Sequence, residues 1–191
     1  MARTHLGRVQ VAHPVTVYVA LLGGINVGGR SLKMDLLRAI ASGCGFEVVS
    51  TFIQSGNVLF RSTARASAVT EQLHDAILEA SRIDTSIALR TAAQLRKVIT
   101  TNPLTDRSDD PTKLSVTFLF AGVKPTMNAL ASQDYAPDEV AVVGHEAYLY
   151  TPNGMGKSTL VPKVTKQLGL SGTTRNWRST NKLADLADAM R

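Results

Sequence analysis

The chain has 191 residues, 44% hydrophobic and 19% charged, a balance that is typical of a globular protein and excludes a disordered one. The 21 Lys and Arg residues against 15 Asp and Glu give a net charge of +6, which favours an anionic partner but is also explained by solubility alone. The single cysteine, Cys44, excludes an internal disulfide and a cysteine-based zinc cage, and it fits a reducing, cytoplasmic compartment.

The N-terminal residues 1–14 carry no apolar segment of the kind that a signal peptide has, and we interpret them as a loose arm. No run of the chain approaches the roughly 18 consecutive apolar residues that a membrane span needs. We therefore expect no membrane partner.

The first half of the chain, 15–103, has the pattern of a small α+β unit. Apolar periodicity and turn residues predict a strand at 15–22, a helix capped by Ser31, a hairpin of 46–54 and 58–62, a helix at 67–82 and a strand at 85–90. This order is that of the split βαβ, or ferredoxin-like, arrangement. A further helix is expected at 92–100, and 104–112 is the expected linker.

The second half, 113–191, repeats part of this order. It predicts a strand at 113–121, a helix at 125–132, a hairpin of 138–144 and 147–151, and helices at 158–168 and 179–190. We therefore expect two tandem ferredoxin-like halves, the second an incomplete copy that ends in a helix where the last strand should come. The residues expected to be buried are Leu22, Leu36, Ile40, Val58, Leu73, Ile77, Val116, Phe118 and Val142.

Two glycine-rich loops, 23–31 and 153–159, each stand between an expected strand and an expected helix. The first turn of a helix offers free N–H groups and the positive end of the helix dipole, and glycine allows a ligand to approach the backbone closely. The loops therefore indicate contact with a phosphate-like group. Their candidate ligand-binding residues are Gly24, Asn26, Gly28, Gly29, Arg30, Asn153, Gly154, Gly156, Lys157 and Ser158.

Neither loop completes the phosphate-binding pattern of nucleotide hydrolases. Arg30 stands where that pattern has lysine, and Thr151 occupies the first glycine position of the second loop. No apolar strand ends in an aspartate that could hold magnesium, which phosphoryl transfer requires. The sequence also shows no catalytic constellation, no histidines at metal-ligand spacing and no cofactor motif, so whether the protein is an enzyme stays open.

Two further segments have both a structural and a ligand-binding interpretation. The predicted hairpin tip offers Gln54, Ser55 and Asn57, but a tight turn also needs such residues. The second segment, Arg175, Asn176 and Trp177, places the only tryptophan beside arginine. It suits stacking on a base of single-stranded nucleic acid, or packing of the indole in the core.

Several motifs in fixed order resemble a family of uncharacterised bacterial proteins, domain of unknown function 1697. The matching segments are ALLGGINVGG (20–29), FIQSGNVLF (52–60), KLSVTFLF (113–120), YLYTPNGMGKS (148–158) and TTRNWRSTNKL (173–183). The resemblance runs from about residue 15 to the end of the chain, and it departs from the family at Gly23, where the family has an arginine. It implies a cytoplasmic α+β protein with two ferredoxin-like halves and brings no known activity.

Three functions follow from these observations. The first is a binding module for a phosphate-bearing ligand, either a nucleotide or single-stranded nucleic acid, at the glycine-rich loops. The alternatives are an enzyme that acts on a phosphorylated small molecule and a structural module that associates through its sheets, as in a homodimer. Convergence of both glycine loops and Trp177 on one cleft would favour a ligand site.

Overall fold

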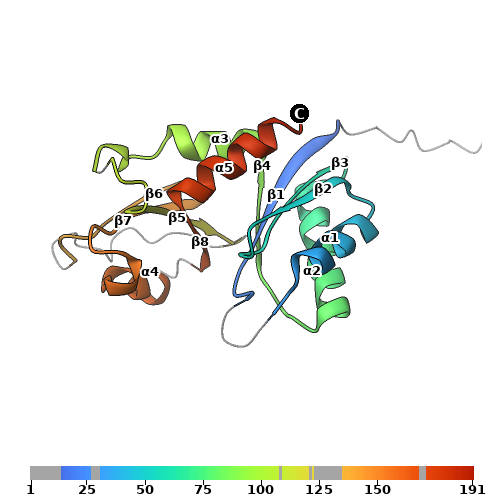
Figure 1. Cartoon of the computed structure of the whole chain (residues 1–191), viewed down its shortest axis with the longest axis horizontal. Coiled ribbons are helices and arrows are strands. Elements are labelled where there is room, and N and C mark those ends of the chain that lie inside the picture. The colour runs from blue at the N-terminus through green and yellow to red at the C-terminus, as the bar shows by residue number, and fades with distance from the viewer. Residues whose placement is uncertain (1–13, 27–30, 108, 121, 123–134, 168–170) are drawn as a thin grey trace, which may run out of the picture.

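The computed structural model describes residues 14–26, 31–107, 109–120, 122, 135–167 and 171–191, and they form an α+β fold with two antiparallel sheets (Figure 1). The first sheet has the strand order β2-β3-β1-β4, formed by β1 (Thr16–Leu22), β2 (Glu47–Phe52), β3 (Asn57–Ser62) and β4 (Ile87–Thr91). The second has the order β6-β7-β5-β8, formed by β5 (Leu114–Leu119), β6 (Glu139–Val143), β7 (Glu146–Tyr150) and β8 (Gly172–Asn176).

The helices cover both sheets and fill the space between them. They are α1 (Met34–Gly43), α2 (Ala66–Ser81), α3 (Ala92–Thr100), α4 (Leu160–Gln167) and α5 (Trp177–Asp188), with short 3-10 turns at η1 (Thr105–Arg107) and η4 (Met155–Lys157). In Figure 1, α3 and α5 lie side by side between the sheets, α1 and α2 cover the first sheet, and α4 lies against the second. No helix in the described part of the chain has the length and apolar character that a membrane crossing needs.

One hydrophobic core joins the two halves. The inner faces of both sheets meet there with α3 and α5, and its buried residues include Val19, Leu21, Leu95, Val116, Phe118, Tyr148 and Leu183. A second cluster lies beneath α1 and α2, and a third lies beneath α4. Burial of apolar side chains stabilises a fold by about 25 cal/mol per Å², so the shared core holds the halves in one body. The predicted domain limits at 104–112 stay a prediction.

The second half is not an incomplete copy, because β8 supplies the strand that the sequence analysis missed. β8 pairs with β5, as β4 pairs with β1, so the two sheets have equivalent strand orders. Its sequence, GTTRN, contains no large apolar residue and therefore lacks the usual signal of a strand. A Cβ at Gly172 would lie 2.4 Å from the carbonyl oxygen of Phe118, so only glycine allows the backbones this approach.

Two expectations about α1 are wrong. Ser31 does not cap it, because the helix begins at Met34 after Lys33, which makes no side-chain capping bond. Leu36 is 41% exposed, since the helix turns Met34, Leu37 and Ile40 toward the sheet instead. Of the other residues expected in the core, Val142 is half-buried and the rest are buried. The predicted arm up to residue 13 and the predicted helix at 125–132 lie outside the described residues.

Candidate functional site

The first glycine loop leaves β1 and leads to α1, and Asn26 ties it to the neighbouring hairpin tip. The Asn26 amide donates to the carbonyl oxygens of Gln54 (2.7 Å) and Leu32 (3.2 Å), and its oxygen accepts from the Leu32 N–H (2.7 Å). Asn26 has a φ of 53°, a left-handed conformation that asparagine tolerates, and exposed Gly24 has a φ of 66°. The candidates Gly28, Gly29 and Arg30 lie outside the described residues.

The hairpin tip between β2 and β3 is held from within. Asn57 is fully buried, and its amide donates to the Phe52 carbonyl and to Ser55 Oγ, both at 2.9 Å. Gly56 has a φ of +74°, and a Cβ there would lie 2.4 Å from Cδ1 of Ile25 in the first glycine loop. The structure thus brings the first glycine loop and the hairpin tip together, through contacts that serve the fold.

Arg175 on β8 joins this cluster from the second half. Its Nε donates to Oδ1 of Asn57 (2.6 Å), and Nη2 donates to the carbonyl oxygens of Leu22 (3.0 Å) and Ser55 (2.8 Å). Nη1 donates to Thr173 Oγ1 (2.6 Å) and the Thr174 carbonyl (2.9 Å), so all five guanidinium N–H groups have protein acceptors. Burial away from water lowers the pKa of Arg175 to about 10. We call this arrangement the Arg175 clasp.

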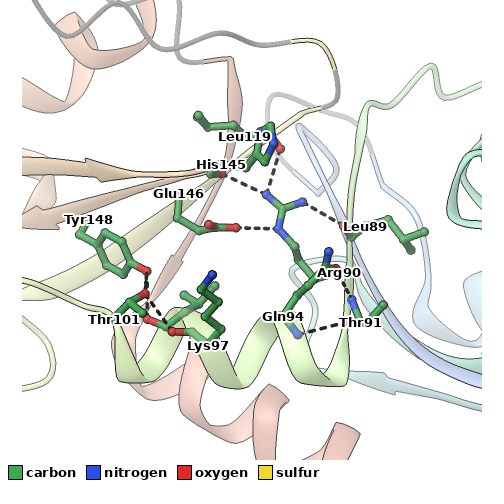
Figure 2. Close-up of polar contacts among 11 residues, drawn as sticks. Leu89, Arg90, Thr91, Gln94, Lys97, Thr101, Leu119, His145, Glu146 and Tyr148 are labelled. Atoms are coloured by element: carbon green, nitrogen blue, oxygen red, sulfur yellow. Dashed lines mark hydrogen bonds and ion pairs between the residues drawn. The ribbon is translucent and has the colours of Figure 1, made fainter.

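Arg90 on β4 forms a second clasp in the opposite direction, from the first half into the second (Figure 2). Its Nε donates to Oε1 of Glu146 at 2.7 Å, and the two side chains are only 10% and 13% exposed. Nη2 donates to the carbonyl oxygens of His145 (3.0 Å) and Leu119 (3.2 Å), and Nη1 donates to that of Leu89 (2.9 Å). We call this arrangement the Arg90 clasp.

The two clasps occupy equivalent positions in the two halves. Each arginine is the fourth residue of an edge strand, β4 or β8. Each donates to the carbonyl oxygen of the last residue of β5 or β1, the first strand of the other half. Each also donates to the side chain of the first residue of β7 or β3, the third strand of the other half. The corresponding acceptors are Leu119 with Leu22, Glu146 with Asn57, and His145 with Gly56. This correspondence is a repeat that could not be detected in the sequence, because the arginine and the leucine whose carbonyl accepts from it are the only residue types that the two clasps share.

The second glycine loop lies elsewhere. It follows Tyr150, at the end of β7 remote from Glu146, and contains the exposed residues Asn153, Gly156 and Lys157 and half-buried Gly154. Ser158 Oγ accepts from the backbone N–H groups of Leu160 and Val161 (3.2 and 3.1 Å), so the loop's own hydroxyl already satisfies two N–H groups at the start of α4. Among the described residues, no hydrogen bond joins the two glycine loops.

The segment after Arg175 begins α5. The Asn176 side chain accepts from the Ser179 N–H at 2.8 Å and caps the helix, and half-buried Trp177 packs against the central core. Convergence of both glycine loops and Trp177 on one cleft, which would favour a ligand site, is therefore not observed in the described residues.

A cleft of about 920 Å³ lies between the halves. One wall is a face of α2, the opposite wall is a face of α3, and β4 forms the floor beside the hairpin of β6 and β7. Its lining is largely apolar with a set of polar groups, which is the composition of small-molecule sites. The polar lining includes Ser67, Thr70, Glu71, His74, Arg90, Gln94, Lys97, Thr101 and Glu146.

Two basic side chains that line this cleft differ in their partners: His74 is paired with acidic residues, whereas Lys97 has no such partner among the described residues. His74 contacts Asp75 (3.0 Å, Nδ1) and Asp84 (3.1 Å, Nε2), and these hydrogen bonds raise its pKa above the usual value. Lys97 is exposed and has no ion-pair partner in the described part of the chain. Among the described residues, no group of three or more histidine, cysteine or acidic side chains is placed to hold a metal ion.

The cleft residues could not be recognised as a site from the sequence. They come from α2, β4, α3 and the β6–β7 hairpin, which are separated along the chain and meet only through the packing of the halves. The only related signal in the sequence is the arginine at the fourth position of β4 and of β8, and its repetition is visible only once β8 is recognised as a strand.

Comparison with known proteins identifies the family and the fold. The family described as "Protein of unknown function (DUF1697)" matches residues 15–148. The structure of a conserved bacterial protein from Streptococcus pneumoniae is similar, with a TM-score of 0.74 and 19% identity, over 92% of this chain and 99% of that chain. Comparison with curated proteins finds no match. The chain therefore belongs to the DUF1697 family of proteins of unknown function.

Proposed function

We propose that the protein is a binding module for a phosphate-bearing small molecule of nucleotide size, and that this ligand lies in the cleft between the two halves. The observation that carries the proposal is the cleft itself. Its volume of about 920 Å³ lies within the range of roughly 300–1,000 Å³ found for small-molecule sites.

The first turn of α2 is evidence that a phosphate binds at one end of the cleft. Ala66 and Ser67 line the cleft there, and the N-cap residue Arg65 makes no side-chain hydrogen bond to the helix. The first backbone N–H groups of a helix have no acceptor within it and favour an anion. Lys97 on the opposite wall adds a positive charge that no described side chain neutralises.

The apolar lining of the cleft is evidence that a flat heterocycle binds beside the phosphate. Leu89 of β4 and Phe120, the residue after β5, line the cleft and are half-buried, whereas the other apolar lining residues Ile87, Val98 and Leu119 are buried in the cores. Aromatic and aliphatic side chains of this kind bind the faces of a base, and polar groups around them fix its orientation.

A nucleotide is favoured over a nucleic-acid strand. The strand hypothesis needs the guanidinium of Arg175 and the ring of Trp177 to be open to a ligand. Arg175 has all its donors engaged and Trp177 packs against the central core. A cytoplasmic location also suits this ligand, and the free thiol of Cys44 is consistent with a reducing compartment.

The edge strand β2 disfavours association of two chains through the first sheet. The pairing of β2 with β3 shifts register between Glu47 and Ser50, and Val48 within this bulge has a φ of 51°. Bulges of this kind twist an edge strand and discourage pairing with another chain. A homodimer that forms through this edge is therefore disfavoured, and the homodimer expected from the sequence stays a prediction.

Each half is proposed to have the ferredoxin-like, split βαβ topology. The equivalent strand orders of the two sheets support this description, as do α2 between β3 and β4 and α4 between β7 and β8.

A thermal-shift screen tests the proposed function. The probes are nucleoside monophosphates, ribose 5-phosphate and inorganic phosphate. A ligand at 100 times its Kd stabilises the folded state by about 2.7 kcal/mol, which raises the Tm of a chain of this size by roughly 5–10 °C. No shift with any probe would contradict the proposal.

Two lysine variants locate the site. A charge-assisted contact contributes about 1.5–3 kcal/mol, so Lys97→Ala should weaken the binding of adenosine monophosphate by roughly tenfold to a hundredfold. Lys157→Ala, which removes an exposed charge from the second glycine loop, is the matched control and should leave the affinity unchanged. The opposite result would move the site to the second glycine loop.

A further inference from the structure

We propose that Glu146 has a second role beyond the Arg90 clasp, as the hydrogen-bond acceptor that recognises a hydroxyl or amino group of the ligand in the cleft. This inference rests on the proposed function. It makes Glu146 a specificity-determining residue, and it names the chemistry of the ligand at the floor of the cleft: an O–H or N–H donor.

The Glu146 carboxylate is held firmly in place. Its Oε1 accepts from Arg90 Nε at 2.7 Å, and the guanidinium is itself fixed by the carbonyl oxygens of Leu89, Leu119 and His145. Figure 2 shows the Glu146 carboxylate beside the Arg90 guanidinium and above α3, the helix that carries Lys97. A carboxylate fixed in this way loses little conformational freedom when it binds a ligand.

The other oxygen of Glu146 is available. Oε2 has no hydrogen-bond partner among the described residues, and it is not one of the unpartnered atoms that are sealed from solvent. Glu146 lines the cleft, and an ionised carboxylate oxygen can only accept hydrogen bonds. A ligand group that meets Oε2 must therefore donate.

The Arg175 clasp shows that the fold does not require a carboxylate at this position. Asn57 stands at the position equivalent to Glu146, and its amide oxygen accepts from Arg175 Nε at 2.6 Å. Asn57 is fully buried, and its nitrogen is also engaged, with Phe52 and Ser55. An amide thus suffices for a clasp, and Glu146 adds a negative charge and an open oxygen where the cleft lies.

Matched ligands test this inference on the unaltered protein. Adenosine monophosphate is compared with 2′-deoxyadenosine monophosphate, which lacks a hydroxyl donor, and with inosine monophosphate, which has a carbonyl in place of the amino group. A hydrogen bond to a charged group is worth tenfold to a hundredfold in affinity, so one of these analogues should bind that much more weakly. The analogue that does so tells a hydroxyl donor from an amino donor. Equal affinities for all three would overturn the inference.

The variant Glu146→Gln tests the residue itself. Glutamine keeps an oxygen for Arg90 Nε, so the Tm should stay unchanged, while the preference for adenosine monophosphate over the weaker analogue should fall at least tenfold. Glu139→Gln is the matched control, because Glu139 also pairs with an arginine (Arg107, 2.9 Å) but does not line the cleft. If Glu146→Gln keeps the full preference, Glu146 serves the clasp alone and the proposed function stands. If the unaltered protein binds no nucleotide, the proposed function fails, and this inference fails with it.

Discussion

Replacement of Gly56 by alanine should destabilise the fold for two separable reasons. The left-handed φ of +74° costs an alanine about 1–2 kcal/mol. The new Cβ would also lie 2.4 Å from Cδ1 and 2.8 Å from Cγ1 of Ile25, a buried side chain, and overpacking of this kind costs about 1–3 kcal/mol. We therefore expect Gly56→Ala to lower the free energy of unfolding by about 2–5 kcal/mol.

Urea denaturation of three further variants, Gly45→Ala, Ile25→Ala and the double variant, separates the backbone cost from the steric cost. Gly45 has a φ of +76° with open space around it, so Gly45→Ala should show the backbone cost alone, about 1–2 kcal/mol. Ile25→Ala removes the atoms that the new Cβ meets, so the double variant Gly56→Ala/Ile25→Ala should lose less stability than the sum of the two single variants. The difference, a coupling of at least about 1 kcal/mol, measures the steric contact.

Two results would refute this reasoning. One is a loss of stability in Gly56→Ala no larger than that in Gly45→Ala, which would mean that the hairpin tip and the first glycine loop are not in contact. The other is strict additivity of Gly56→Ala with Ile25→Ala. Either would also remove the structural explanation of the hairpin tip and return it to the candidate ligand-binding segments.

Three other predictions concern the clasps, the cleft and the missed strand. Arg175→Lys supplies three donors in place of five and should lower the free energy of unfolding by about 2–4 kcal/mol in urea denaturation, whereas Arg178→Lys, at an exposed site, should change it by less than about 0.5 kcal/mol. The pKa of His74 is raised in the folded state, so the pairing of this histidine stabilises the protein fully below pH 6.5, and this stabilisation is lost as the pH rises through the folded pKa. An NMR titration should place the midpoint of His74 above 6.5, and Asp84→Asn should lower that midpoint. Gly172→Ala should cost about 3 kcal/mol or prevent folding, because a Cβ would meet a backbone oxygen that cannot move aside; circular dichroism during heating would contradict this if the Tm stayed unchanged.

Elements defined by local interactions could be predicted from the sequence. The helix expected at 92–100 is confirmed as α3, where Thr91 and Gln94 form a reciprocal capping box at its start. Both predicted hairpins are also confirmed, as β2 with β3 and β6 with β7. Their alternating apolar residues and short turns lie within a few residues of each other, so the signal is complete without the rest of the chain.

The start of α1 shows where a local pattern is insufficient. Leu32, Leu36 and Ile40 are spaced as one helical face, yet Leu36 points to solvent. The helix begins only at Met34, and the sheet beneath it selects the face of Met34, Leu37 and Ile40. Apolar periodicity offered two overlapping faces, and only packing against the sheet chose between them.

The candidate site depended wholly on the tertiary structure. Arg175 donates to Asn57, 118 residues earlier in the chain, and Arg90 donates to Glu146, 56 residues later. No window of sequence contains both partners, and GTTRN does not have the apolar alternation of a strand. The local elements and the α+β class could be predicted from the sequence alone, since these follow from contacts between near neighbours. The packing of the two halves decided which arginines are buried and where the cleft lies, because the side chains that satisfy a buried charge come from elements far apart in the chain.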